Sequence, residues 1–157
     1  MADAFYTFFH NEVLITAVIA WCVAQVTKTI IHAIINHGID FRRLIGDGGM
    51  PSAHSATMTA AALTTGLKCG FDSPVFAVMF LLAAVVMHDA HGVRLETGKQ
   101  AKIINEMMDT LEMFNKLDDG SLTPEQKLKE FVGHTPVQVF GGFCVGILVA
   151  LLRFFLR

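Results

Sequence analysis

Four stretches of this chain are dominated by apolar residues, and they lie at about 13–35, 51–67, 74–88 and 137–156. The first has roughly the 20 residues that a helix needs to cross the hydrocarbon core of a bilayer. The second consists mostly of Ala, Thr and Met, and such small side chains suit a helix that other helices surround. We therefore predict one all-α domain over residues 1–157, a polytopic membrane bundle of about four transmembrane helices.

A long polar segment, 95–135, separates the third stretch from the fourth. From Lys99 to Phe114, apolar residues are interleaved with charged ones at helical spacing, as in a helix that lies on a surface. This pattern predicts an amphipathic interfacial helix between the third and fourth transmembrane helices. A second short helix is expected to begin at Pro124, because proline is favoured at the first position of a helix.

Composition supports the membrane as the solvent of this chain. Hydrophobic residues make up 53% of the sequence and charged residues 17%, which is too apolar for an ordinary soluble domain. We expect membrane lipid as a partner and a multi-pass location in the cell membrane. The formal net charge is −2 and the basic residues form no basic run, so nucleic acid is excluded as a partner.

Polar residues form a stripe along the deeper half of the first predicted helix. They are Gln25, Lys28, Thr29 and His32, which fall at helical spacing. A lysine is costly against lipid, so Lys28 either faces the interior of the bundle or extends its side chain to the interface. The first arrangement indicates a functional residue.

Basic residues divide unequally between the two sides of a bundle in which all four helices cross. The positive-inside tendency predicts that the side with more of them is cytoplasmic and that both termini lie outside. The larger set is Arg42, Arg43, Arg94, Lys99, Lys102, Lys116, Lys127 and Lys129, and the smaller set is Lys68, Arg153 and Arg157.

The stretch 48–56 reads Gly-Gly-Met-Pro-Ser-Ala-His-Ser-Ala and precedes the second predicted helix. Two glycines free the backbone, and the start of a helix offers N–H groups and the positive end of a dipole to an anion. His54 would stand beside that anion. The alternative is purely structural, a loop that enters a helix with Ser52 or Ser55 as its cap.

Two further polar motifs reach the same predicted membrane face. One is His88-Asp-Ala-His-Gly-Val-Arg94 at the end of the third helix, and the other is Gly133-His-Thr-Pro136 before the fourth. Asp89 and Arg94 could also be a structural salt bridge that closes the end of the helix. The convergence of several polar motifs on one face favours a site there over caps and loop ends alone.

These motifs carry a resemblance to a known family. The stretch 48–55, the Asp89–Arg94 motif with Gly98-Lys-Gln-Ala101, and Leu128-Lys-Glu130 through Gly133 to Val139 are similar to the divergent type-2 phosphatidic acid phosphatase family. That group is described as related to acid phosphatases and vanadium-dependent haloperoxidases. The resemblance covers nearly the whole chain.

The resemblance implies a metal-free, two-step hydrolysis, which we expect to act on a lipid phosphate or isoprenoid diphosphate, and the charge count places it at the cytoplasmic face. His134 would attack phosphorus and form a phosphohistidine, and His54 would protonate the leaving oxygen. Ser52, the backbone at Ala53, and Ser55 would bind phosphate. No cofactor and no metal are expected.

The chain departs from the superfamily pattern at several positions. Gln138 stands where an aspartate would orient and charge-stabilise the nucleophilic imidazole, and an amide offers no negative charge. Asp89 is the candidate to compensate from the neighbouring helix end. The expected arginine six residues before His134 is Leu128, so other cations must hold the phosphate. Arg94 is favoured, and the further candidates are Lys28, Arg42, Arg43 and Lys129.

Other functions remain open at this point. A non-catalytic binder or transporter of phosphorylated lipid would keep the anion site, and Gln138 is the feature that favours it. A metal site at His88, Asp89 and His91 is the third possibility, because positions 88 and 91 are adjacent on a helix. The spacing of Gly142 and Gly146 permits close helix contact and a homo-oligomer through the fourth helix.

Overall fold

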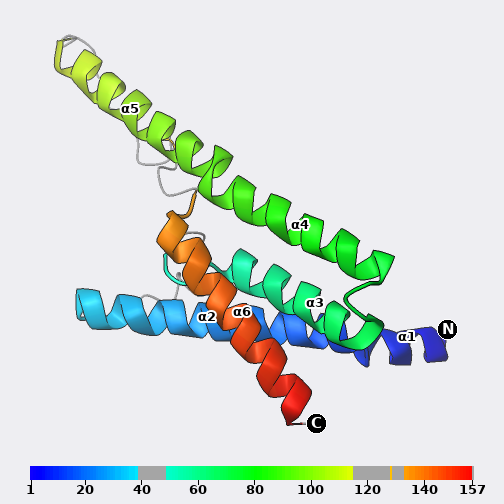
Figure 1. Ribbon diagram of the computed structural model, residues 1–157. Coiled ribbons are helices and arrows are strands. Elements are labelled where there is room, and N and C mark those ends of the chain that lie inside the picture. The colour runs from blue at the N-terminus through cyan, green and yellow to red at the C-terminus, as the bar shows by residue number, and fades with distance from the viewer. Residues whose placement is uncertain (39–48, 115–127, 129–132, 157) are drawn as a thin grey trace.

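The computed structural model describes residues 1–38, 49–114, 128 and 133–156. Within these residues all regular structure is helical, as predicted (Figure 1). The helices are α1 (Ala2–Phe9), α2 (Glu12–Asn36), α3 (Ala53–Cys69), α4 (Pro74–His91), α5 (Val93–Phe114) and α6 (Pro136–Phe155).

Four of the helices begin at a capping side chain that the sequence makes visible. Asn11, Ser52, Ser73 and Thr135 each accept a hydrogen bond from a backbone N–H in the first turn of α2, α3, α4 and α6. Such a bond satisfies one of the N–H groups that a helix start leaves without a partner. The apolar stretches therefore become helices within a few residues of the predicted bounds.

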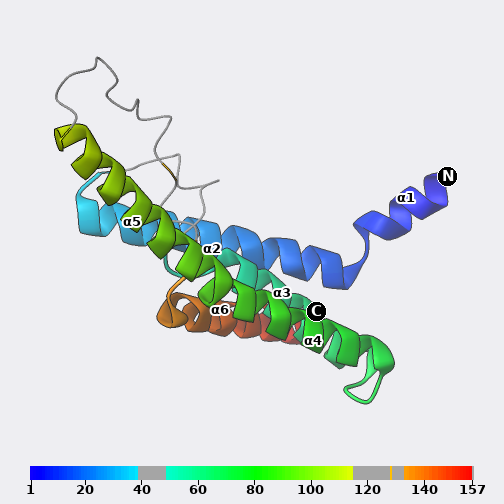
Figure 2. The same cartoon turned by 90° about the horizontal axis from the view of Figure 1, so that it is seen from above.

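Several elements differ from the prediction. Helix α1 was not predicted, because eight residues are too few to show a helical period. Pro51 precedes α3 instead of entering its first turn, and α5 starts at Val93 instead of Lys99. Helix α5 follows α4 end to end with a change of direction between them (Figures 1 and 2), and Pro124 lies outside the described residues.

Among the described residues, three helical segments are long and apolar enough to cross a membrane. They are α2, the α4–α5 rod over 74–110, and α6. Their outer faces expose apolar side chains, among them Val26, Leu81 and Leu148. Helix α3 has 17 residues, of which ten are buried, and packs against α2, α4 and α6. That α3 crosses the bilayer, and that α5 lies at the interface, stay predictions.

Small residues let α3 pack closely against its neighbours. Ala20 and Ala24 of α2 meet Ala56 and Ala60 of α3 in a cluster without solvent exposure. A Cβ on Gly146 of α6 would lie 2.6 Å from the carbonyl oxygen of Ala56, so only a glycine permits this approach.

The polar motifs converge at one end of the bundle, where α2 and α4 finish and α3 and α6 begin (Figure 1). The Ser52 N–H donates to the carbonyl of Gln138 at 2.9 Å, which ties the starts of α3 and α6 together. The His134 N–H donates to the carbonyl of Ala90 at 2.9 Å, which ties the approach to α6 to the end of α4.

Candidate active site

A cavity of about 340 Å³ opens at this end of the bundle. It brings together side chains from α3, α4, the first turn of α5 and the segment before α6. Its lining residues are His54, Val85, Val86, Asp89, Ala90, Arg94 and His134. Four residues that the sequence singled out, two histidines, an aspartate and an arginine, therefore share one space.

The two histidine rings face this cavity from different elements. His54 is the second residue of α3 and is exposed, whereas His134 lies two residues before α6 and is 4% exposed. Their ring centroids are 6.1 Å apart, with 55° between the planes. Because Ser52 caps α3 and Ala90 holds the backbone of His134, both imidazoles project from fixed positions.

Gln138 fixes the tautomer of His134. The Gln138 Oε1 accepts a hydrogen bond from the Thr135 N–H at 3.1 Å, as part of the capping box of α6, and lies 3.3 Å from His134 Nδ1. An oxygen that faces a backbone N–H is an acceptor, so His134 Nδ1 carries the proton and donates. The basic lone pair of the ring is therefore on Nε2.

Asp89 and Arg94 form an ion pair at the wall of the cavity. The Arg94 Nε donates to Asp89 Oδ2 at 2.6 Å, and both side chains are about half exposed to solvent. A guanidinium presents five donors in a planar fork, and this geometry suits a phosphate as well as a carboxylate. The arrangement can hold one negatively charged group beside the two imidazoles.

The serines of the 48–56 stretch are buried and do not line this cavity. Ser52 and Ser55 have no exposed surface, and the Ser52 Oγ accepts a hydrogen bond from the Ser55 N–H at 3.4 Å. Neither serine is among the lining residues, nor is Ala53. The capping role left open for Ser52 is confirmed, while phosphate binding by these residues stays a prediction.

Lys28 faces the interior of the bundle, with 3% of its surface exposed. Its aliphatic carbons pack against Gly49, where an added Cβ would lie 3.2 Å from Lys28 Cγ and where φ is +86°. Lys28 thus supports the turn before α3 and is not among the residues that line the cavity. Arg42, Arg43 and Lys129 lie outside the described residues.

The sequence analysis did not identify the apolar residues that line the site. Val85, Val86 and Ala90 line the cavity, and Ala90 also anchors His134 through its carbonyl. No signal in the sequence marks a backbone hydrogen bond between segments so far apart. The two valines could have been found from their position one turn before Asp89 on the same helix.

In the described part of the chain, no three His, Cys, Asp or Glu side chains lie close enough together to bind one metal ion. The rings of His88 and His91 are 5.3 Å apart and perpendicular. The His91 Nδ1 lies 2.6 Å from the carbonyl oxygen of Met87, to which it donates. This hydrogen bond lies within the last turn of α4.

Comparison with known proteins gives two matches. A family model described as Divergent PAP2 family matches residues 9–149. An uncharacterized membrane protein, YuiD of Bacillus subtilis strain 168, is 39% identical over 147 residues, which cover 90% of this chain and 93% of the relative. No solved structure matches the chain.

Proposed function

Because the chain belongs to the divergent PAP2 family, we propose that this membrane protein is a phosphatase for a lipid phosphate or isoprenoid diphosphate. The observation that carries the proposal is the pairing of His54 and His134 across one cavity, with Arg94 beside them. Two imidazoles and a guanidinium are the groups that a metal-free phosphoryl transfer needs.

The first step is attack by His134 Nε2 on phosphorus. A P–N bond forms while the bond from phosphorus to the ester oxygen breaks, and that oxygen takes a proton from His54. Attack requires roughly 3–3.5 Å between the reacting atoms, and proton transfer roughly 3 Å to the leaving oxygen. The His54 and His134 ring centroids are 6.1 Å apart, so both imidazoles are close enough to reach the same phosphoryl group.

In the second step, water replaces the histidine on phosphorus. His54, now neutral, takes a proton from the water, the P–N bond breaks and inorganic phosphate leaves. Arg94 compensates the negative charge of the phosphoryl oxygens, and the positive end of α3 adds to this field. As Arg94 turns towards phosphate, the Asp89 carboxylate becomes available to offset the positive charge of the His134 ring.

The location of the site is inferred from the number of basic residues on each side of the membrane. With the richer basic side in the cytoplasm, the site lies at the cytoplasmic face of the cell membrane. A phosphorylated lipid enters sideways, with its headgroup at the interface and its chains in the bundle. Gly142 and Gly146 bury themselves against α3, so any homo-oligomer would use other faces of α6.

The test is hydrolysis by the purified protein in detergent. Phosphatidic acid, phosphatidylglycerol phosphate and undecaprenyl diphosphate are offered, and phosphate release is measured. His134→Ala should lower the rate by about 10³-fold or more. The control is His88→Ala, an exposed histidine outside the cavity, which should keep the rate within about twofold.

The roles of the two histidines can be distinguished with a substrate whose leaving group needs no protonation. With p-nitrophenyl phosphate, His54→Ala should regain most of its rate, whereas His134→Ala should not, because it lacks the nucleophile. Unchanged hydrolysis by His134→Ala would contradict the mechanism. Radioactive phosphate trapped on the protein by rapid quenching should be absent from that variant.

The second candidate is a non-catalytic binder or transporter of phosphorylated lipid. It is favoured by Gln138, whose oxygen orients His134 but carries no charge to stabilise an imidazolium. This candidate predicts that wild-type protein binds the same lipids and releases no phosphate. Saturable binding that Arg94→Ala weakens, together with an absence of hydrolysis, would favour it over the phosphatase.

A further inference from the structure

Helix α1 presents a row of exposed aromatic side chains. Phe5, Tyr6, Phe8 and Phe9 are each at least 56% exposed. The centroid of the Phe9 ring lies 4.7 Å from that of Phe5 and 5.3 Å from that of Phe8, so the three phenylalanines form one continuous apolar surface. Among the described residues, α1 has at most a marginal contact with any other helix. The described part of the bundle therefore leaves this surface uncovered.

The opposite side of α1 is polar. Asp3 and Thr7 lie about one turn apart, and the Thr7 hydroxyl donates to the Asp3 carbonyl at 3.0 Å. Phe5 lies about 160° around the helix axis from Thr7, since each residue turns the helix by about 100°. Helix α1 thus has one apolar and one polar side, which is the pattern of a helix that lies in a membrane interface.

The chain itself places α1 at a membrane surface. Helix α2 is apolar enough to cross a membrane, and its 25 residues rise about 37 Å, which exceeds the hydrocarbon core of about 30 Å. Its first residue, Glu12, is charged and pairs with Lys68 of α3, so we take the start of α2 to lie in the headgroup layer. Two residues, His10 and Asn11, join α1 to α2, and they reach at most about 7 Å.

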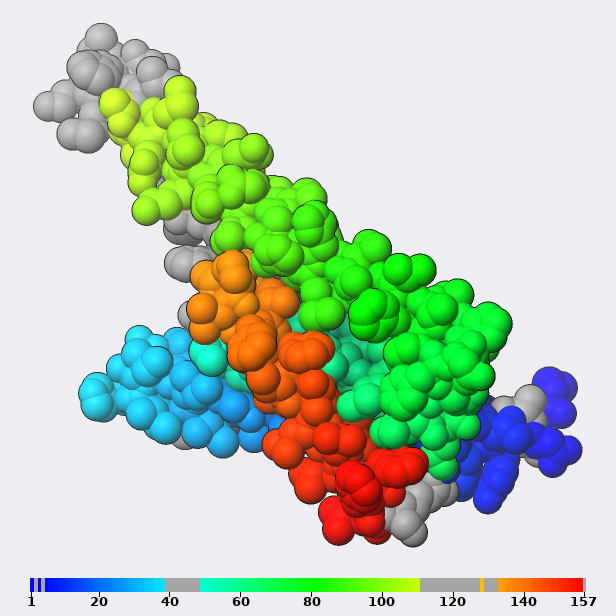
Figure 3. All heavy atoms as spheres, in the orientation of Figure 1, coloured from blue at the N-terminus to red at the C-terminus, as the bar shows by residue number. Residues whose placement is uncertain are grey.

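The direction of α1 leaves its aromatic side open to this layer. Figure 2 shows α1 displaced from the line of α2 by the break between the two helices and directed away from the other helices. Figure 3 shows its side chains projecting beyond the edge of the bundle. An isolated helix of fewer than about 12 residues is marginal in water. A helix of eight residues with so little packing therefore needs another medium to hold it.

We propose that α1 lies flat in the headgroup layer of the leaflet where α2 starts, as an anchor that fixes the depth of that end of the bundle. Phe5, Phe8 and Phe9 point towards the acyl chains, and Tyr6 keeps its hydroxyl among the headgroups, where aromatic residues are enriched. Residues 1–11 contain no lysine or arginine, so the anchor depends on apolar burial and does not require anionic lipid. This inference is independent of the phosphatase proposal.

Tryptophan fluorescence measures the depth of each side of α1. The single tryptophan of the chain, Trp21, is replaced by phenylalanine, and Phe5→Trp and Thr7→Trp are compared in the full chain in vesicles of phosphatidylcholine brominated at successive acyl positions. The indole of Phe5→Trp should lie about 5–10 Å inside the boundary between headgroups and acyl chains. Thr7→Trp, the matched control, should be shallower by about 10 Å, the diameter of a helix.

Two results would overturn the inference. Equal depths of the two indoles, with strong quenching of Phe5→Trp by aqueous iodide, would mean that α1 stands in water. Shielding of the Phe5→Trp indole that is lost when the protein is diluted with lipid would mean that a second copy of the chain, and not lipid, covers the aromatic side.

Hydrogen exchange tests whether lipid stabilises α1. A variant with Phe5, Phe8 and Phe9 all replaced by serine should lose the helix, so the α1 amides should exchange at least about tenfold faster than in wild type. The α2 amides of the same sample should keep their protection, which shows that the bundle is intact. The control is Asp3→Ser with Thr7→Ser, which changes the polar side and should leave α1 protected. Equal exchange of α1 in wild type and in the triple serine variant would contradict the anchor.

Discussion

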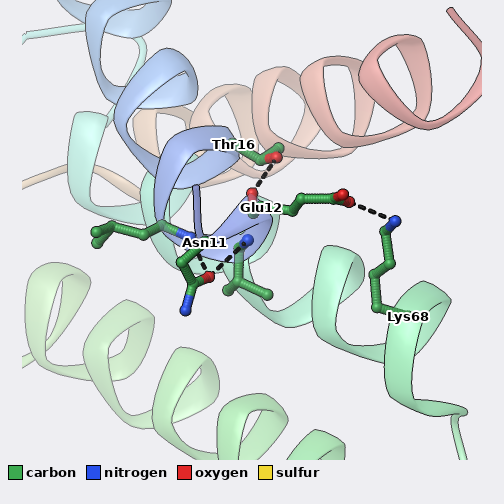
Figure 4. A network of polar contacts seen from close by, with 6 residues as sticks. Asn11, Glu12, Thr16 and Lys68 are labelled. Carbon is green, nitrogen blue, oxygen red and sulfur yellow. Dashed lines mark hydrogen bonds and ion pairs between the residues drawn. The ribbon is translucent and has the colours of Figure 1, made fainter. Parts of the chain in front are cut away.

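The two ends of the helix bundle both carry polar clusters, but the clusters differ in what they surround. At the end opposite the histidines, the Asn11 side chain caps α2, the Thr16 hydroxyl donates to the Glu12 carbonyl at 2.6 Å, and Glu12 pairs with Lys68 (Figure 4). The space among these groups and Arg153 is about 20 Å³, whereas the histidine end encloses about 340 Å³.

A space of about 20 Å³ holds little more than one water molecule. The polar groups around it bond to one another, and these bonds fix where α2 starts and how α3 packs against it. At the histidine end, a comparable set of charged and polar side chains surrounds room for a phosphoryl group. Charge in an apolar bundle therefore does not identify a site by itself, and what distinguishes the histidine end is that two imidazoles, a carboxylate and a guanidinium line one cavity.

The largest expected difference between the two ends is in the rate of hydrolysis after removal of an arginine from each. Arg94→Ala deletes the cation that lines the cavity, and we expect hydrolysis of phosphatidic acid to fall by about 10²–10³-fold, as when one preorganised donor is lost from a transition state. Arg153→Ala, at the far end, should keep the rate within about twofold. Steady-state phosphate release from both variants is the measurement.

Arg94→Lys sharpens this result. Lysine keeps the charge and loses the planar fork, so its rate should lie between those of wild type and Arg94→Ala. A loss in Arg153→Ala equal to that in Arg94→Ala would mean that the two ends are not functionally distinct.

A methyl group at Gly142 should disturb the histidine end by about 10²-fold in rate, since misplacement of catalytic groups by about 1 Å has effects of that size. A Cβ there would overlap the carbonyl oxygen of Ser52 and lie 2.9 Å from Ser55 Cβ. Helix α6 must then move away from the start of α3, which shifts His134 relative to His54. The unfolding free energy should fall by about 1–3 kcal/mol, measured in a denaturing detergent.

Gly141 provides the matched control one residue away. Its added Cβ would meet the terminal methyl of Met50 at 3.2 Å, and this flexible side chain can yield. Gly141→Ala should therefore keep both the rate and the stability near those of wild type. Equal effects of the two alanines would show that the α3–α6 contact does not position the histidines.

Gln138→Glu should raise the rate by about tenfold, a small part of what a carboxylate contributes in other catalytic triads. Glutamate has the same length, so its oxygens can still accept from Thr135 N–H and His134 Nδ1 while adding the negative charge that stabilises an imidazolium. Gln138→Leu, which removes the acceptor, is the control and should lower the rate. A Gln138→Glu variant slower than wild type would show that the amide is already the better partner.

The sequence predicts helices well where local chemistry marks their ends. Ser73-Pro74 and Thr135-Pro136 each join a capping hydroxyl to a proline suited to the first turn, and α4 and α6 start there. The switch to ionisable residues after 88 indicated the end of the third helix and the next helix was expected at Lys99, yet α4 runs to His91 and α5 starts at Val93. Whether a chain bends at a glycine depends on its tertiary surroundings, which local pattern does not contain.

The site could be predicted as a set of chemical groups but not as a shape. Spacing and resemblance selected His54, Asp89, Arg94 and His134, and these line one cavity. The same reasoning made Lys28 a candidate for phosphate binding, which stays a prediction, and it gave no sign that the stem of Lys28 packs against Gly49. Which polar residue faces a cavity and which supports the wall behind it depends on helix packing, and a linear motif carries no information about that.

The smallest expected effect belongs to the ion pair at the far end. Lys68 and Glu12 are partly exposed, with 44% and 25% of their side-chain surface accessible, so solvent screens their attraction. A double-mutant cycle with Glu12→Gln and Lys68→Met should give a coupling of about 0.5 kcal/mol in the free energy of unfolding. Phosphate release should stay within about twofold of wild type in all three variants, because neither Glu12 nor Lys68 lines the cavity. A coupling that appears in the rate but not in the unfolding free energy would mean that the far end acts on catalysis through α3, and the separation of a structural end from a chemical one would then be wrong.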